Sequence, residues 1–144
     1  MPESLVVPMA VLALWTILIL NLIPIARIRA ARAGRVHVKD FRYGESPSVP
    51  GDVSLPNRDY MNLLELPVLF YTACLVALVS RRMDPMMLYL AWAFVAARIA
   101  HSLVHLTYNN VIHRLIVFAV GLAILLIMWI WQLWWVLGPV QHTQ

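Results

Sequence analysis

The chain has 144 residues, of which 62% are hydrophobic and only 12% are charged, with a formal net charge of +4. Because a soluble domain carries about 25% charged residues and a disordered chain is poor in apolar ones, both classes are excluded. The excess positive charge does not indicate nucleic acid, since seven of the eleven Lys and Arg residues lie in one connector between apolar segments, residues 27–58. The composition predicts one integral membrane domain, residues 1–144.

Four apolar stretches are long enough to cross a bilayer, which takes about 20 residues. In chain order they cover residues 5–26, 61–80, 85–107 and 111–137. The first is not typical of a cleaved signal peptide, because its leader contains no Lys or Arg and its apolar run is long. We predict an all-α integral membrane four-helix bundle.

The connector 27–58 has two parts. Its arginines up to Arg35 predict a basic extension of the first helix, and the Gly and Pro residues between Gly44 and Pro56 predict an irregular loop of about 15 residues. Such a loop is either a lid or binding segment or a solvated tether attracted to anionic headgroups.

Charge counts predict the orientation in the membrane. The seven basic residues of the connector place it in the cytoplasm, and both termini on the opposite side, by the positive-inside rule. Four tryptophans near the end of the fourth span are typical of an interfacial aromatic belt: Trp129, Trp131, Trp134 and Trp135. We expect an integral protein of a bacterial inner membrane, with the lipid bilayer as its surroundings.

Polar side chains at membrane depth are costly and need an explanation. At the start of the second span, Arg58, Asn62 and Glu65 fall within about 60° of one another around a helix, so they form one polar stripe. Pro67 follows and is expected to loosen the helix just beyond the stripe.

A second stripe lies on the third span, where Arg98, His101 and His105 share one helix face. Arg114 stands at the start of the fourth span. Since one carboxylate, Glu65, cannot neutralise three arginines, the surplus positive charge predicts an anion-binding site.

Two alternatives stay open at this stage. A purely structural network would pair Glu65 with Arg98 or Arg58 and let Asn62 bridge helices. A metal site is suggested by the spacing of His101 and His105, but the residue after the first histidine is not the glutamate of zinc proteases, and nearby arginines repel a cation. We predict no metal site.

The run Arg58-x-x-x-Asn62-x-x-Glu65 followed by Pro67 resembles the helix-two signature of the membrane-associated proteins in eicosanoid and glutathione metabolism, the MAPEG family. The segment Arg98-x-x-His101-x-x-x-His105, and then Arg114, is similar to its helix-three and helix-four signature. The length and the basic first connector also agree with a bacterial-type member.

The resemblance implies a homotrimer that binds glutathione as co-substrate between subunits near the cytoplasmic face. It assigns glutathione binding to Arg29, Arg58, Asn62, Glu65, Arg98, His101 and His105, and a catalytic role beside the sulfur to Arg114. An adjacent guanidinium lowers the pKa of a thiol and so favours the reactive thiolate. The chain departs from many members at His105 and Phe118, where they place tyrosines.

The function implied is that of a membrane-bound glutathione-dependent transferase or peroxidase acting on a lipophilic small molecule. The alternative is a non-catalytic membrane protein of the same fold whose arginines bind anionic lipid or another anion. A transporter is disfavoured because the chain shows no paired repeat.

Overall fold

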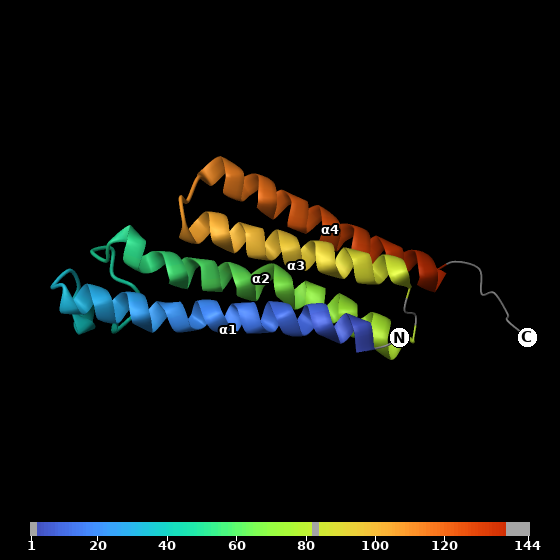
Figure 1. The fold of residues 1–144 in the computed structure, drawn as a ribbon, viewed down its shortest axis with the longest axis horizontal. Helices are drawn as coiled ribbons and strands as arrows, with labels where there is room; N and C mark the ends of the chain where they lie inside the picture. The colour runs from blue at the N-terminus through green and yellow to red at the C-terminus, as the bar shows by residue number, and fades with distance from the viewer. Residues whose placement is uncertain (1–2, 82–83, 138–144) are drawn as a thin grey trace, which may run out of the picture.

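The computed structural model describes residues 3–81 and 84–137 and contains, within them, four long α-helices (Figure 1). They are α1 (Glu3–Arg32), α2 (Gly51–Val79), α3 (Pro85–Leu106) and α4 (Val111–Leu137). Each is long and apolar enough to cross a membrane, so the predicted all-α, four-span fold is confirmed. The chain ends for which we predict a non-cytoplasmic location, residues 1–2 and 138–144, lie outside the described residues.

Helix α2 begins at Gly51, whereas the sequence predicted an irregular loop as far as Pro56, a helix from Arg58 and a membrane span from about Met61. Pro56 lies inside the helix, where its ring removes the N–H that would bond to the carbonyl of Asp52. Because Asp52 is exposed in the first turn, water can replace the lost bond. The helix also continues through Pro67 to Val79. Because α1 ends at Arg32 and α2 begins at Gly51, the connector between them is confined to residues 33–50.

The helices pack mainly as two antiparallel pairs, α1 with α2 and α3 with α4 (Figure 1). The pairs meet where the rings of Phe70 on α2 and Phe94 on α3 stack with centroids 4.7 Å apart. Both rings are fully buried. Most of α4 is exposed and apolar, as expected for a helix that faces lipid or a neighbouring subunit.

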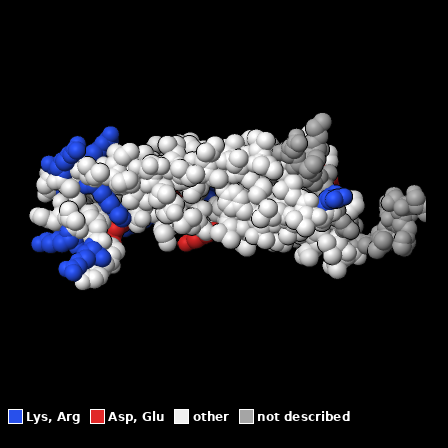
Figure 2. Space-filling model, turned by 90° about the horizontal axis from the view of Figure 1, so that it is seen from below, with Lys and Arg blue, Asp and Glu red and all other residues white. Residues whose placement is uncertain are grey.

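The connector is held against the helix ends by ion pairs. Arg27 on α1 contacts Glu45 at 3.0 Å and covers the ring of Phe41 at 4.5 Å. Phe41 ends the short 3-10 helix η1 (Val38–Phe41). Lys and Arg gather at this end of the molecule (Figure 2), which is also the end where α3 turns into α4 (Figure 1).

At the opposite end of the bundle, Asp84 joins the start of α3 to α4. One oxygen of its carboxylate accepts a hydrogen bond from the backbone N–H of Met86 at 2.9 Å and so caps α3. The other oxygen accepts from the indole N–H of Trp131 on α4 at 3.1 Å. At least one tryptophan of the predicted interfacial belt therefore also ties α4 to the start of α3.

Candidate functional site

The polar stripe predicted on the second span faces away from the interior of the protomer. Arg58 and Glu65 are exposed, and Asn62 is half-buried. Glu65 stands midway along α2, and among residues 3–81 and 84–137 its carboxylate makes no hydrogen bond or ion pair. We call Arg58, Asn62 and Glu65 the outer stripe.

The carboxylate that α2 turns inward is Asp59, which the sequence analysis did not assign to the site. Asp59 is fully buried and lies about 100° around the helix from Arg58. It shares the buried face with Leu63 and Phe70, and this helical spacing is the signal that could have revealed it. Neither of its oxygens has a hydrogen-bond partner among the described residues.

Helix α3 brings its predicted polar residues together inside the bundle. Arg98, His101 and His105 are all buried, as is Ser102 between the histidines. The Arg98 guanidinium donates a 2.9 Å hydrogen bond to the backbone carbonyl of Asn62 and lies 5.9 Å from the centre of the Phe118 ring.

Of these α3 residues, Ser102, His105 and Arg98 act on the buried carboxylate of Asp59. We call the buried polar set the inner cluster: Asp59, Arg98, His101, Ser102 and His105.

Arg114 lies at the edge of the inner cluster and is half-buried. Its Nη1 atom lies 3.3 Å from Nε2 of His105 and donates a 3.0 Å hydrogen bond to the side-chain oxygen of Asn109. The side-chain oxygen of the next residue, Asn110, accepts hydrogen bonds from the backbone N–H groups of Ile112 and His113, in the first turn of α4, at 3.0 and 3.1 Å. The α3–α4 turn therefore fixes Arg114 beside His105.

The charge balance differs from the one predicted, because a second carboxylate belongs to it. Asp59 and Glu65 together oppose Arg58, Arg98 and Arg114, which still leaves more positive than negative charge. The structural alternative in which Glu65 forms an ion pair with Arg98 or Arg58 is not seen within the described part of the chain. Asp59 is the carboxylate that shares the buried interior with Arg98.

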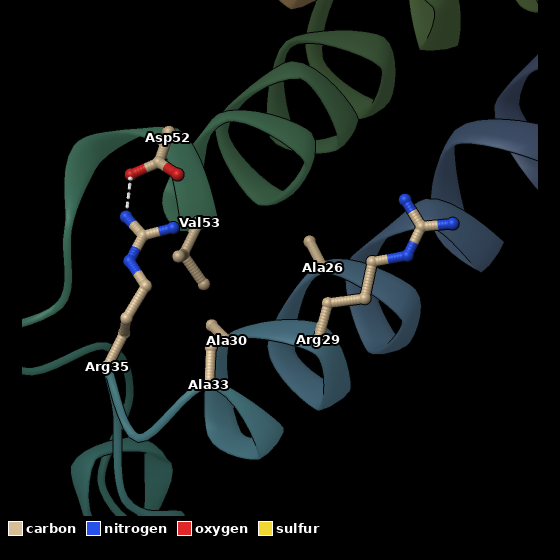
Figure 3. A pocket seen from close by; sticks show the side chains of 7 residues that line it. All are labelled: Ala26, Arg29, Ala30, Ala33, Arg35, Asp52 and Val53. Carbon is tan, nitrogen blue, oxygen red and sulfur yellow. Dashed lines mark hydrogen bonds and ion pairs between the residues drawn. The ribbon is translucent and has the colours of Figure 1, made fainter.

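Arg29 lies apart from both groups, in a shallow pocket of about 400 Å³ between the end of α1 and the start of α2 (Figure 3). The pocket floor is formed by Ala26, Ala30 and Ala33. At its rim Arg35 pairs with Asp52 at 2.7 Å, and this hydrogen bond raises the pKa of Arg35. Figure 3 shows the Arg29 guanidinium directed away from that pair.

No three potential metal ligands come together anywhere in residues 3–81 and 84–137. The structure thus places four of the predicted residues, Arg98, His101, His105 and Arg114, in or against the inner cluster, and Arg98 contacts the backbone carbonyl of Asn62 in the outer stripe. It leaves Arg58 and Glu65 on the protomer surface and Arg29 in the separate pocket.

Comparison with known proteins identified one family. A model of the MAPEG family matches residues 5–134, which is most of the chain. Neither a curated protein nor a solved structure gave a match.

Proposed function

Because the chain belongs to the MAPEG family, whose members are membrane glutathione transferases and peroxidases, we propose that it is a glutathione-dependent transferase or peroxidase. Its second substrate would be a lipophilic electrophile or hydroperoxide that arrives through the bilayer. The observation that carries the proposal is the outer stripe, a set of charged and polar side chains on the outside of an apolar spanning helix.

The outer stripe has the chemistry that glutathione requires. Glutathione carries two carboxylates and one ammonium group, so it needs both cationic and anionic partners. Arg58 can bind a carboxylate through a forked pair of hydrogen bonds, and Glu65 can bind the ammonium group. The amide of Asn62 can form hydrogen bonds with the peptide groups between them. The exposure of Arg58 and Glu65 leaves both available to a bound molecule.

The position of Glu65 favours assembly into the homotrimer that the family resemblance implies. A charged side chain at the centre of a spanning helix costs about 2.5–3.5 kcal/mol when it faces lipid. A neighbouring copy packed against α2 would remove Glu65 from lipid and close a binding site over the outer stripe. Glutathione would then lie between two subunits.

Arg114 is the residue we propose beside the sulfur. The thiol of bound glutathione would lose its proton to water, and the thiolate sulfur would then bond to the electrophilic carbon as the leaving group departs with its electron pair. Arg114 stays charged when partly desolvated, and its contacts to His105 and Asn109 hold the guanidinium in one place. A fixed positive charge lowers the free energy of the thiolate without reorganisation during the reaction.

Arg98, His101 and His105 would support this site from behind, because their burial keeps them from the protomer surface. The remaining predicted contact is Arg29. It could contact glutathione only at the end of α1 that leads into the connector. The connector and the α3–α4 turn lie at the same end of the bundle (Figure 1), so with the connector in the cytoplasm Arg114, in the first turn of α4, would lie near the cytoplasmic face.

Isothermal titration of the purified protein with glutathione tests the proposal. We expect saturable binding, and we expect Glu65→Gln and Arg58→Ala each to weaken it about tenfold, since each removes one charge-assisted contact. The matched control is Arg32→Ala, which removes an exposed arginine from the last turn of α1 and should leave the affinity unchanged.

Measurements on the purified protein also separate the proposed glutathione chemistry from the lipid-binding alternative. Absence of binding at millimolar glutathione would overturn it. An anionic lipid that stays with the purified protein and is lost from Arg58→Ala, without any thiol-dependent turnover, would favour the lipid-binding alternative.

A further inference from the structure

The contact between Arg114 and His105 fixes how the imidazole is protonated. An arginine side chain can only donate hydrogen bonds, so Nε2 of His105 must accept in the 3.3 Å contact with Nη1 of Arg114. A neutral imidazole that accepts at Nε2 carries its hydrogen on Nδ1. The contact therefore requires the Nδ1–H form of His105.

The Nδ1 atom of His105 needs a partner of its own. It is buried and has no hydrogen-bond partner among the described residues. At membrane depth an unpaired donor is costly, because neither bulk water nor lipid can satisfy it.

Asp59 is the complementary group. Its two oxygens are buried and without a hydrogen-bond partner in the described part of the chain. The groups close enough to act on the Asp59 carboxylate are the hydroxyl of Ser102 and the charges of His105, Arg98 and Arg114, so its two oxygens have room for the serine hydroxyl and for one further donor. Since an ionised carboxylate only accepts hydrogen bonds, it matches the Nδ1–H group of His105.

His101 is not an equivalent partner for this carboxylate. The charged or titratable groups that act on His101 are Arg98, His105 and Arg114, and Asp59 is not one of them. The two imidazoles are 6.1 Å apart and nearly perpendicular, so their ring nitrogens point in different directions.

We propose that Asp59 holds His105 in its Nδ1–H form, directly or through one buried water, so that Nε2 of His105 orients the guanidinium of Arg114. Asp59 and His105 are then positioning residues, because they act on the reaction through Arg114. Their effect on turnover rests on the proposed glutathione chemistry, whereas the protonation of His105 does not.

Nitrogen NMR of isotope-labelled histidine in detergent tests the protonation directly. We assign the His105 signals by their loss in His105→Gln. The wild-type protein should show a protonated Nδ1 and an unprotonated Nε2 at His105. Asp59→Asn should shift His105 towards protonation at Nε2, while the matched control His101→Gln should leave the hydrogen of His105 on Nδ1.

A protonated Nε2 in the wild-type protein would overturn the proposal, even if Asp59→Asn does not fold. An unchanged His105 spectrum in a folded Asp59→Asn variant would also overturn it.

Turnover of glutathione with a chlorodinitrobenzene electrophile gives the second readout. We expect Asp59→Asn and His105→Leu to lower kcat about tenfold with little change in the KM for glutathione, since the loss of one hydrogen bond to a charged group is of that size. His105→Gln should recover part of the loss, because its amide oxygen can accept from Arg114. Equal losses in His105→Gln and His105→Leu would contradict a positioning role.

Absence of turnover in the wild-type protein would count against the proposed function. The NMR result would still decide which nitrogen of His105 is protonated.

Discussion

The guanidinium of Arg98 donates a 2.9 Å hydrogen bond to the backbone carbonyl of Asn62. This bond joins the inner cluster to the helix that carries the outer stripe. Because Arg98 is fully buried, as is Asp59, the two opposite charges share the buried interior of the bundle. The stability of the bundle and the geometry of the proposed site therefore depend on the same residues.

Replacing Arg98 by Met should destabilise the protein by about 1.5–3 kcal/mol, because it removes the charge-assisted hydrogen bond to the carbonyl of Asn62 and one of the positive charges that oppose the buried Asp59 carboxylate. Unfolding in detergent, followed by circular dichroism, measures the loss. The double variant Asp59→Asn with Arg98→Met should be more stable than Arg98→Met alone. If the two single losses simply add in the double variant, Asp59 and Arg98 are not coupled.

Gly121 on α4 should tolerate alanine but not leucine. A Cβ atom at this position would lie 3.8 Å from Cβ of Ala97 and 3.8 Å from Cδ of Arg98, which is ordinary van der Waals contact. Gly121→Ala should be neutral or stabilise by up to about 1 kcal/mol, the helix-propensity difference. Gly121→Leu should push α4 away from α3 and lower the Tm in detergent. A stable Gly121→Leu variant would contradict the close packing described here.

Asp84 should contribute to stability through two separable bonds. Asp84→Ala loses both the cap of α3, worth about 1 kcal/mol, and the bond to Trp131, worth about 0.5–1.5 kcal/mol. Asp84→Asn keeps an oxygen for the cap, and Trp131→Phe loses only the indole bond. We expect the Tm to fall most in Asp84→Ala and by smaller, similar amounts in the other two. A Trp131→Phe variant as unstable as Asp84→Ala would argue against this division.

The orientation of the chain can be tested by cysteine labelling, because the native Cys74 is fully buried and provides an unreactive background. Tyr43 in the connector and Ser80 directly after α2 are both exposed. The connector and the end of α2 lie at opposite ends of the bundle (Figure 1). With the connector in the cytoplasm, a membrane-impermeant maleimide added to intact cells or spheroplasts should label Ser80→Cys and spare Tyr43→Cys. The reverse pattern would invert the proposed topology.

The sequence was sufficient to predict the four spans, because long apolar runs have no other stable structure in a chain so poor in charge. It misplaced the start of α2, because Pro50, Gly51 and Pro56 were interpreted as a loop. Near an exposed helix end, water offsets the hydrogen bond that Pro56 cannot make. Whether a proline interrupts a helix therefore depends on its position along the helix and not on its presence alone.

Helical spacing correctly grouped Arg98, His101 and His105 on one face but could not show which way each polar face points. On α2 the charged outer stripe faces outward, and the inward face carries Asp59 among apolar neighbours. A single buried carboxylate hardly changes a hydrophobic pattern, so it was found only when α2 and α3 were seen packed together.

A structure of the assembled protein determined with glutathione would test the central proposal most directly. We predict density for the tripeptide against Arg58, Asn62 and Glu65, between two copies of the chain, with its sulfur beside Arg114. An outer stripe that contacts lipid, with no peptide density at Arg58 and Glu65 at saturating glutathione, would contradict it.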